Sequence, residues 1–177
     1  MAKSVLIDRD LGWRELFRKI TRGGEAFAKI GIQQDTRREQ KDGKGPIDMV
    51  QLAAIHEFGA PKAGIPERSF IRAWHDSHRA QITQLQARLG RQFIDGKITL
   101  RQMIAKLGAF GQGGIRKFIV ALKQPILAKS TVRRRRKGTG KNKDVHSDNP
   151  LVDTGQLVAS VFSISVIRGV EVERTGP

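Results

Sequence analysis

The residues of this chain that could do chemistry are few, and their spacing fits no catalytic pattern. His56 and Glu57 look like the start of a zinc-protease helix, but that chemistry needs a second His four residues later on the same face, where Ala60 stands. His75 and His78 lie three residues apart, yet no further His or Cys is near enough to complete a metal site. A solvated helix face explains this pair better, so the sequence predicts neither a metal site nor a cofactor.

Other catalytic signatures are missing as well. The glycines between Gly108 and Gly114 superficially suggest a phosphate-binding loop, but they interrupt a helical pattern and lead into Ile115 and Arg116 instead of Lys and Ser or Thr. No Ser lies in a nucleophile-elbow setting and no pair of carboxylates stands out. The chain has no Cys, which excludes disulfides, zinc ribbons and thiol catalysis. We therefore expect a protein that is not an enzyme.

Net charge is the strongest signal in the composition. The 177 residues include 33 Lys and Arg against 17 Asp and Glu, a formal net charge of +16. A charge of this size favours an anionic partner, either nucleic acid or an acidic protein surface. No apolar run approaches the roughly 18 residues of a membrane span, and the first residues lack the apolar core of a signal peptide. We expect a soluble protein that is made in the cytoplasm and contacts no membrane.

Much of this charge is concentrated between Lys129 and Lys143. Like-charge repulsion and the lack of apolar anchors predict a disordered basic loop over residues 129–149. Its cations could contact phosphates or a partner protein, but it lacks the interleaved aromatic residues that stack on bases. A solvated loop and a nucleic-acid contact therefore both stay open. The candidate contact residues are Arg133, Arg134, Arg135, Arg136, Lys137, Lys141 and Lys143.

The elements that must position these residues follow from the spacing of apolar side chains. Helical spacing is found in 11–23, 47–58, 69–93 and 100–122, and a short helix is expected within 151–161. Alternating or short apolar runs predict strands at Ser4–Ile7, Ala26–Gln33, Val161–Ile167 and Val170–Glu173, the last two forming a hairpin. Residues 35–46 read as an exposed loop. Four glycines lie inside the last long helix, so we expect a kink or break near Gly113.

These elements predict an α+β fold, with one domain over residues 1–177. A small, mostly antiparallel sheet should pack against the long helices, and long flexible loops should join them.

Three segments together carry a more specific signal: residues 52–59 (LAAIHEFG), 65–71 (IPERSFI) and 150–157 (PLVDTGQL). In this order, with a basic stretch after Ser130 and Thr131, they resemble the virion morphogenesis and tail-completion family of tailed phages. The resemblance covers roughly residues 47–170. The usual Arg-Pro-Phe of that family is Arg68-Ser69-Phe70 here, and the chain stops soon after Val172.

The resemblance implies a structural protein of the phage head-to-tail junction. Such a protein would assemble as a ring of six copies that joins the neck to the tail, with neck, connector and tail proteins as partners and genomic DNA in the channel. Its place would be the virion. The alternative is a nucleic-acid-binding module that uses its basic surface. The chain has no helix-turn-helix signature and no predicted aromatic platform, and both absences weigh against this alternative.

The residues of the three segments also have a purely structural interpretation, and we assign them to architecture. Pro66 would fix the backbone before a helix, with Arg68 in the first turn of that helix and Phe70 packed into the core. Asp153, Thr154 and Gly155 would form a capping turn. The remaining members of this set end the preceding helix and are His56, Glu57, Phe58 and Gly59.

Overall fold

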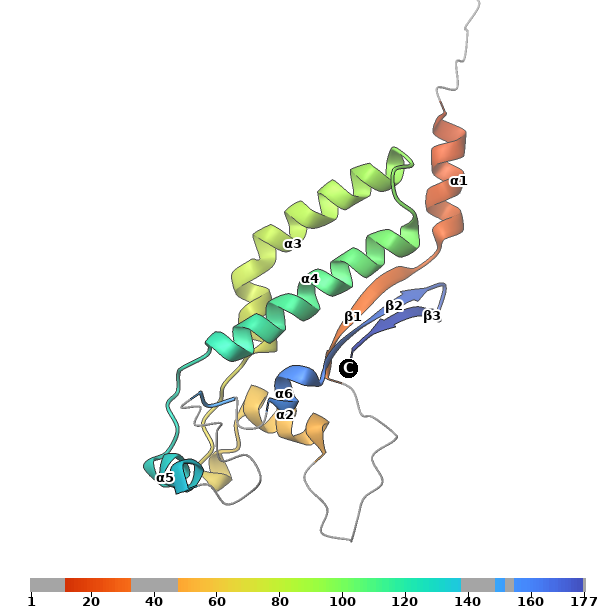
Figure 1. Ribbon diagram of the computed structural model, residues 1–177. Coiled ribbons are helices and arrows are strands. Elements are labelled where there is room, and N and C mark those ends of the chain that lie inside the picture. Colours follow the sequence, from red (N-terminus) through yellow and green to blue (C-terminus); the bar gives the residue numbers. More distant parts are fainter. Residues whose placement is uncertain (1–11, 33–47, 138–148, 152–154, 177) are drawn as a thin grey trace, which may run out of the picture.

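The computed structural model describes residues 12–32, 48–137, 149–151 and 155–176 (Figure 1). The predicted strand at Ser4–Ile7 and the predicted loop at 35–46 lie outside these ranges. So do four of the candidate site residues, which are Lys141, Lys143, Asp153 and Thr154.

The fold is α+β, as predicted. Its helices are α1 (Trp13–Gly23), α2 (Met49–Phe58), α3 (Ile71–Ile94), α4 (Leu100–Ala121), α5 (Lys129–Lys137) and α6 (Gln156–Ala159), with a 3₁₀ turn at Pro61–Ala63. Its strands are β1 (Ala26–Ile32), β2 (Val161–Ile167) and β3 (Val170–Thr175). Figure 1 shows α3 and α4 as a long hairpin, with α4 lying between α3 and the sheet.

The sheet is antiparallel, with strand order β1-β2-β3. β1 pairs with β2 along its whole length, from Ala26 opposite Ile167 to Ile32 opposite Val161. β2 continues into β3 through a tight turn at Arg168 and Gly169, which confirms the predicted hairpin. The central strand β2 is buried along nearly all of its length because a strand flanks it on each side and α4 covers one face.

Helix α4 runs without interruption from Leu100 to Ala121, so the predicted break near Gly113 was wrong. A capping box begins the helix, in which Thr99 and Gln102 exchange side-chain-to-backbone hydrogen bonds. Its glycines allow close approach of neighbouring elements. A Cβ on Gly111 or Gly114 would overlap a side chain of β1 or α3, whereas one on Gly113 would meet nothing within 4 Å.

The core lies where α3, α4, α6 and the start of β2 meet. Its fully buried members include Phe70, Ile119 and Val161. A buried polar network fastens β3 to this core: the Gln112 amide donates to the carbonyl oxygens of Val161 and Thr175 at 3.0 and 3.3 Å, and the Thr175 hydroxyl donates to the Gln112 side-chain oxygen at 2.8 Å. Because each buried polar atom has a partner, the network costs little and fixes one arrangement of helix and hairpin.

The basic segment differs from its prediction. We expected a disordered loop from residue 129 onward, but residues 129–137 form α5. The carbonyl oxygen of Ala128 accepts hydrogen bonds from Thr131 and Val132, whose side chains are half-buried, and these contacts anchor the first turn. Arg and Lys are good helix formers, so propensity and a small anchor outweigh charge repulsion here. Residues 138–148 of the predicted loop lie outside the described part of the chain.

Candidate functional site

The end of α2 places its side chains opposite to expectation. Phe58 is one of the apolar residues whose helical spacing predicted this helix, and such spacing is typical of a buried face, yet Phe58 is 64% exposed and the neighbouring Glu57 is only 5% exposed. The guanidinium of Arg72 lies 5.0 Å from the centre of the Phe58 ring and covers part of it. A carboxylate therefore takes the buried position that the pattern assigned to an aromatic ring.

The Glu57 carboxylate caps the start of α3. The helix's own N-cap residue, Phe70, has no side-chain oxygen to do this. Glu57 instead accepts hydrogen bonds from the backbone N–H groups of Phe70, Ile71 and Arg72 at 2.8, 3.0 and 3.0 Å. The Ser69 hydroxyl and the Arg72 guanidinium donate to the same carboxylate at 2.7 and 3.1 Å. The orphan donors of one helix are thus satisfied by a residue of another.

Two opposing effects set the pKa of the Glu57 carboxyl. Burial, the largest single effect, would raise the pKa because it disfavours the charged form. Hydrogen bonds from the backbone of Ile71, Arg72 and Phe70 and from the Ser69 hydroxyl favour the carboxylate, and together they hold the pKa below its ordinary value. Glu57 is therefore charged at neutral pH. Since both of its oxygens are engaged, it is a structural cap and a poor general base.

Gly59 makes the sharp turn that brings the second segment back against α2. Its φ of 73° lies in the left-handed region, and a Cβ there would stand 2.9 Å from the backbone nitrogen of Glu67. Beyond the turn, the backbone N–H of Arg68 donates to the carbonyl oxygen of His56 at 2.7 Å. The predicted end of the helix at Gly59 is thus confirmed, and the turn requires glycine for two separate reasons.

Arg68 was predicted in the first turn of the long helix, but it lies three residues before Ile71, where α3 begins. The side chain is buried, and its guanidinium donates to the carbonyl oxygens of Pro125 and Ile126 at 3.0 and 3.2 Å. Arg68 therefore joins the segment before α3 to the segment after α4. Phe70, two residues later, is fully buried in the core, as expected.

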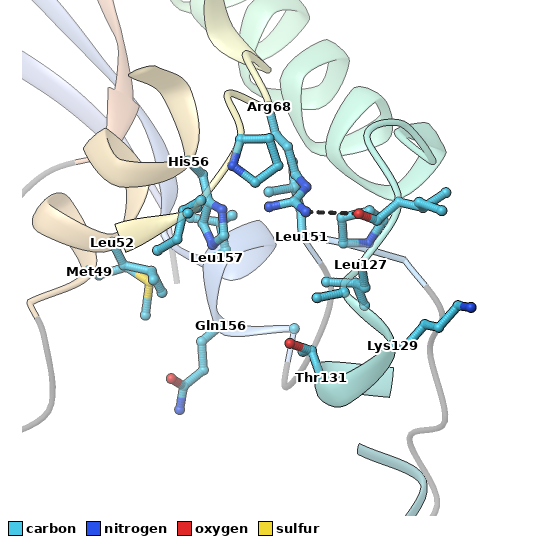
Figure 2. A pocket seen from close by; sticks show the side chains of 17 residues that line it. Met49, Leu52, His56, Arg68, Leu127, Lys129, Thr131, Leu151, Gln156 and Leu157 are labelled. Carbon is cyan, nitrogen blue, oxygen red and sulfur yellow. Dashed lines mark hydrogen bonds between the residues drawn. The ribbon is translucent and has the colours of Figure 1, made fainter. Parts of the chain in front are cut away.

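Next to these contacts lies a depression of about 800 Å³, which we call the corner groove (Figure 2). One wall is the face of α2 that carries Met49, Leu52 and His56. The other walls are the loop 64–68, the segment 126–131 and the segments 150–151 and 155–157. All three segments that carry the family resemblance contribute to it, although they are far apart in the sequence.

Of the predicted basic contact residues, Arg133 to Lys137 lie on α5, and Arg133 is not among the described residues that line the corner groove. Arg133 is exposed on α5, and residues 134–137 continue that helix. Lys129, which was not among the predicted contacts, lies at the rim of the corner groove. Gly155 has a φ of 74° and directly precedes α6. Sequence reasoning missed the groove side chains of 126–128, although an Ile-Leu pair between Pro125 and the basic run could have indicated an apolar surface.

Most of the described side chains that line the corner groove are apolar, and the guanidinium of Arg68 in it is engaged by two carbonyl oxygens. In the described ranges, no cluster of three His, Asp or Glu side chains could hold a metal ion. None of the helices described is long and apolar enough to cross a membrane.

Comparison with known protein families, curated proteins and solved structures finds no match to this chain. The resemblance to tail-completion proteins therefore rests on the three sequence segments alone.

Proposed function

We propose that this protein is a structural component of the head-to-tail junction of a tailed phage. Six copies form a ring that joins neck and tail, and DNA passes through its channel. The protein has no catalytic role in this proposal. It acts by presenting complementary surfaces to neck, connector and tail proteins in the virion.

The observation that carries the proposal is the meeting of the three resembling segments at one corner. Glu57 from the first segment caps the helix that the second segment opens, and Arg68 from the second binds the chain after α4. Leu157 from the third segment lines the same groove as His56 and Arg68. These contacts hold parts of the chain together and do not converge on a reacting group. They therefore favour a structural role for the three segments, as the resemblance implies, over a catalytic one.

The alternative of a nucleic-acid-binding module has less support. On the sheet face that points away from α4, the two phenylalanines are already covered by cations. Lys29 lies 5.5 Å from the centre of the Phe27 ring, and Arg174 lies 4.7 Å from that of Phe162, which is buried. The described strands therefore offer no open aromatic platform on which bases could stack.

The test uses a phage whose genome encodes this chain. Quantitative mass spectrometry of purified particles should find the chain at a fixed ratio to the portal or connector subunit. Deletion of its gene should leave filled heads and finished tails unjoined, and the wild-type chain supplied in trans should restore joined particles. A chain that is absent from purified particles would contradict the proposal and favour a free nucleic-acid-binding protein.

A further inference from the structure

We infer that the corner groove is a docking site for a peptide segment of a partner protein, one that carries apolar anchor residues beside acidic ones. The inference concerns the isolated chain and holds whether or not the proposed junction role is correct.

The apolar part of the inference rests on the side chains that form the groove. Met49 and Leu52 of α2, Leu127 on the opposite side and Leu151 and Leu157 at its base are all apolar (Figure 2). The volume of about 800 Å³ falls within the range of about 300–1,000 Å³ that is usual for ligand sites. A groove with such walls gains free energy when an apolar side chain displaces its water.

The apolar surface of the groove extends onto its exposed rim. Ile126 is 71% exposed, the highest value among the exposed large hydrophobic residues of the described chain. It lines the groove next to the exposed Ala128 and Pro66. Contiguous exposed apolar patches mark interaction surfaces, and these residues extend the apolar wall of the groove onto the surface. The occupant should therefore cover the rim as well as fill the groove.

Charge decides which partner fits. The described residues that line the groove include the cations Arg68 and Lys129 and no Asp or Glu. Exposed Lys62 lies just before the loop wall, and exposed Arg133 lies one turn beyond Lys129 on α5. The acidic Glu67 within that loop is paired with Arg72 at 2.8 Å. A partner that places carboxylates over this rim gains attraction and steering, whereas a basic partner is repelled.

The polar groups favour a peptide over a small polar ligand. Sites for small ligands need precisely placed donors and acceptors that converge on the bound molecule. The Arg68 guanidinium, the strongest donor in the groove, already binds the carbonyl oxygens of Pro125 and Ile126. Lys129 lies at the rim, on a long flexible stem (Figure 2). Apolar walls with a charged rim match a chain segment with alternating anchor and acidic side chains.

The test is fluorescence anisotropy on the purified full chain. The probe is a short fluorescein-labelled peptide of alternating leucine and glutamate, compared with one version that has glutamine for glutamate and another that has serine for leucine. We expect saturable binding of the first peptide, weakened at least several-fold in each of the other two. Equal binding of the glutamine version, or no saturable binding of the leucine–glutamate peptide, overturns the inference.

Matched variants locate the binding. Ile126→Gln should weaken binding about tenfold, because an isoleucine anchor contact is lost. The control Ile94→Gln, at a 48% exposed isoleucine at the end of α3, should leave binding unchanged.

The charge of the rim is tested in the same way. Lys129→Glu should weaken binding more than the control Lys117→Glu, which changes the net charge equally on the exposed surface of α4. Equal loss in target and control variants overturns the inference. Self-association of the chain that Ile126→Gln abolishes assigns the groove to a second copy and overturns it too.

Discussion

A single carboxylate fixes the geometry of the corner. Glu57 lies at the end of α2, yet its hydrogen bonds belong to the first turn of α3. A buried charge is normally costly, but here the N-terminal N–H groups of a helix and the Ser69 hydroxyl replace its water. The contact therefore sets the angle between two helices as well as satisfying their polar groups.

The first prediction concerns Glu57 and pH. Glu57→Gln should lower the free energy of unfolding at neutral pH by about 1–3 kcal/mol, because the charged cap of α3 is lost. The folded pKa of Glu57 is depressed, so its stabilising effect is present above the ordinary glutamate pKa of about 4.3 and is lost as the pH falls through the folded pKa. Thermal melts from about pH 7 downward should show the gap between wild type and variant closing in acid.

Exposed Glu171 supplies the control for this series. Glu171→Gln should leave the melting temperature nearly unchanged at every pH, because surface substitutions usually alter stability by less than about 0.5 kcal/mol. A gap for Glu57→Gln that persists undiminished in acid would show that the charge of the cap contributes nothing.

The second prediction compares two phenylalanines of the same corner. Phe70→Ala should cost about 3–5 kcal/mol, because it opens a cavity in the core, and should lower the melting temperature sharply. Phe58→Ala, at a largely exposed ring, should cost far less. If Phe70→Ala melts like the wild type but no longer supports particle assembly, Phe70 belongs to an interface and its place in the core is wrong.

Sequence reasoning placed Phe70 correctly and Phe58 wrongly, and the difference has a physical cause. Phe70 follows a proline-containing segment and stands at the start of a long amphipathic helix, so its apolar side chain is expected to face the core. The apolar spacing of α2 is ambiguous, because buried Ala53 and exposed Ala54 are alike in the sequence. Only the need of α3 for a cap decides that Glu57 turns inward, and that contact joins two helices.

At the scale of elements, the glycines inside α4 allow neighbouring elements to pack closely against this helix. Each glycine costs about 1 kcal/mol of helix propensity relative to alanine. At Gly108, Gly111 and Gly114 this cost is offset by close contact with Ser163, Ile30 and Trp74. The sequence shows four glycines but cannot show which of them face a neighbour, which is why a break was expected where the helix continues.

The third prediction separates two adjacent glycines of this helix. Gly114→Ala should destabilise the protein by about 1–3 kcal/mol, because the new methyl group overlaps the Trp74 ring. Gly113→Ala should stabilise it by up to about 1 kcal/mol, because no atom lies within 4 Å of the new Cβ and helix propensity improves. Chemical denaturation of the two variants gives both values. The same sign for both would contradict the packing role.

At the scale of the whole molecule, the α+β class and the C-terminal hairpin followed from periodicity, since helices and strands bury different patterns of side chains. The order of strands and the corner groove could not be predicted in this way. Both depend on contacts between distant segments, such as Arg68 with Pro125, that leave no periodic trace. Helix α5 was also missed, because its anchors are only the half-buried Thr131 and Val132.

The fourth prediction concerns the basic run in assembly. Replacing Arg133 to Lys137 by glutamine should leave the melt unchanged, since glutamine is also a good helix former. It should reduce joined, infectious particles by about tenfold or more, because the five positive charges, each expected to contribute a few tenths of a kcal/mol to contacts with acidic partner groups, are removed. The measurement is complementation of a phage that lacks the gene. A five-lysine version, which keeps the charge, is the control, and full infectivity of the glutamine version would make the run merely a solvated helix face.

The pairing of β1 with β2 has a consequence for how the chain is made. Ala26 pairs with Ile167, so the pairing of β1 with β2 cannot be completed until the chain up to Ile167 has left the ribosome. At about 5–20 residues per second, the partner of β1 is synthesised roughly 7 to 27 seconds after β1, whereas the hairpin of α3 and α4 closes on local contacts. During that interval β1 is a mostly apolar segment without a strand on either side. During that time β1 is therefore open to contact with a chaperone or with a neighbouring nascent chain.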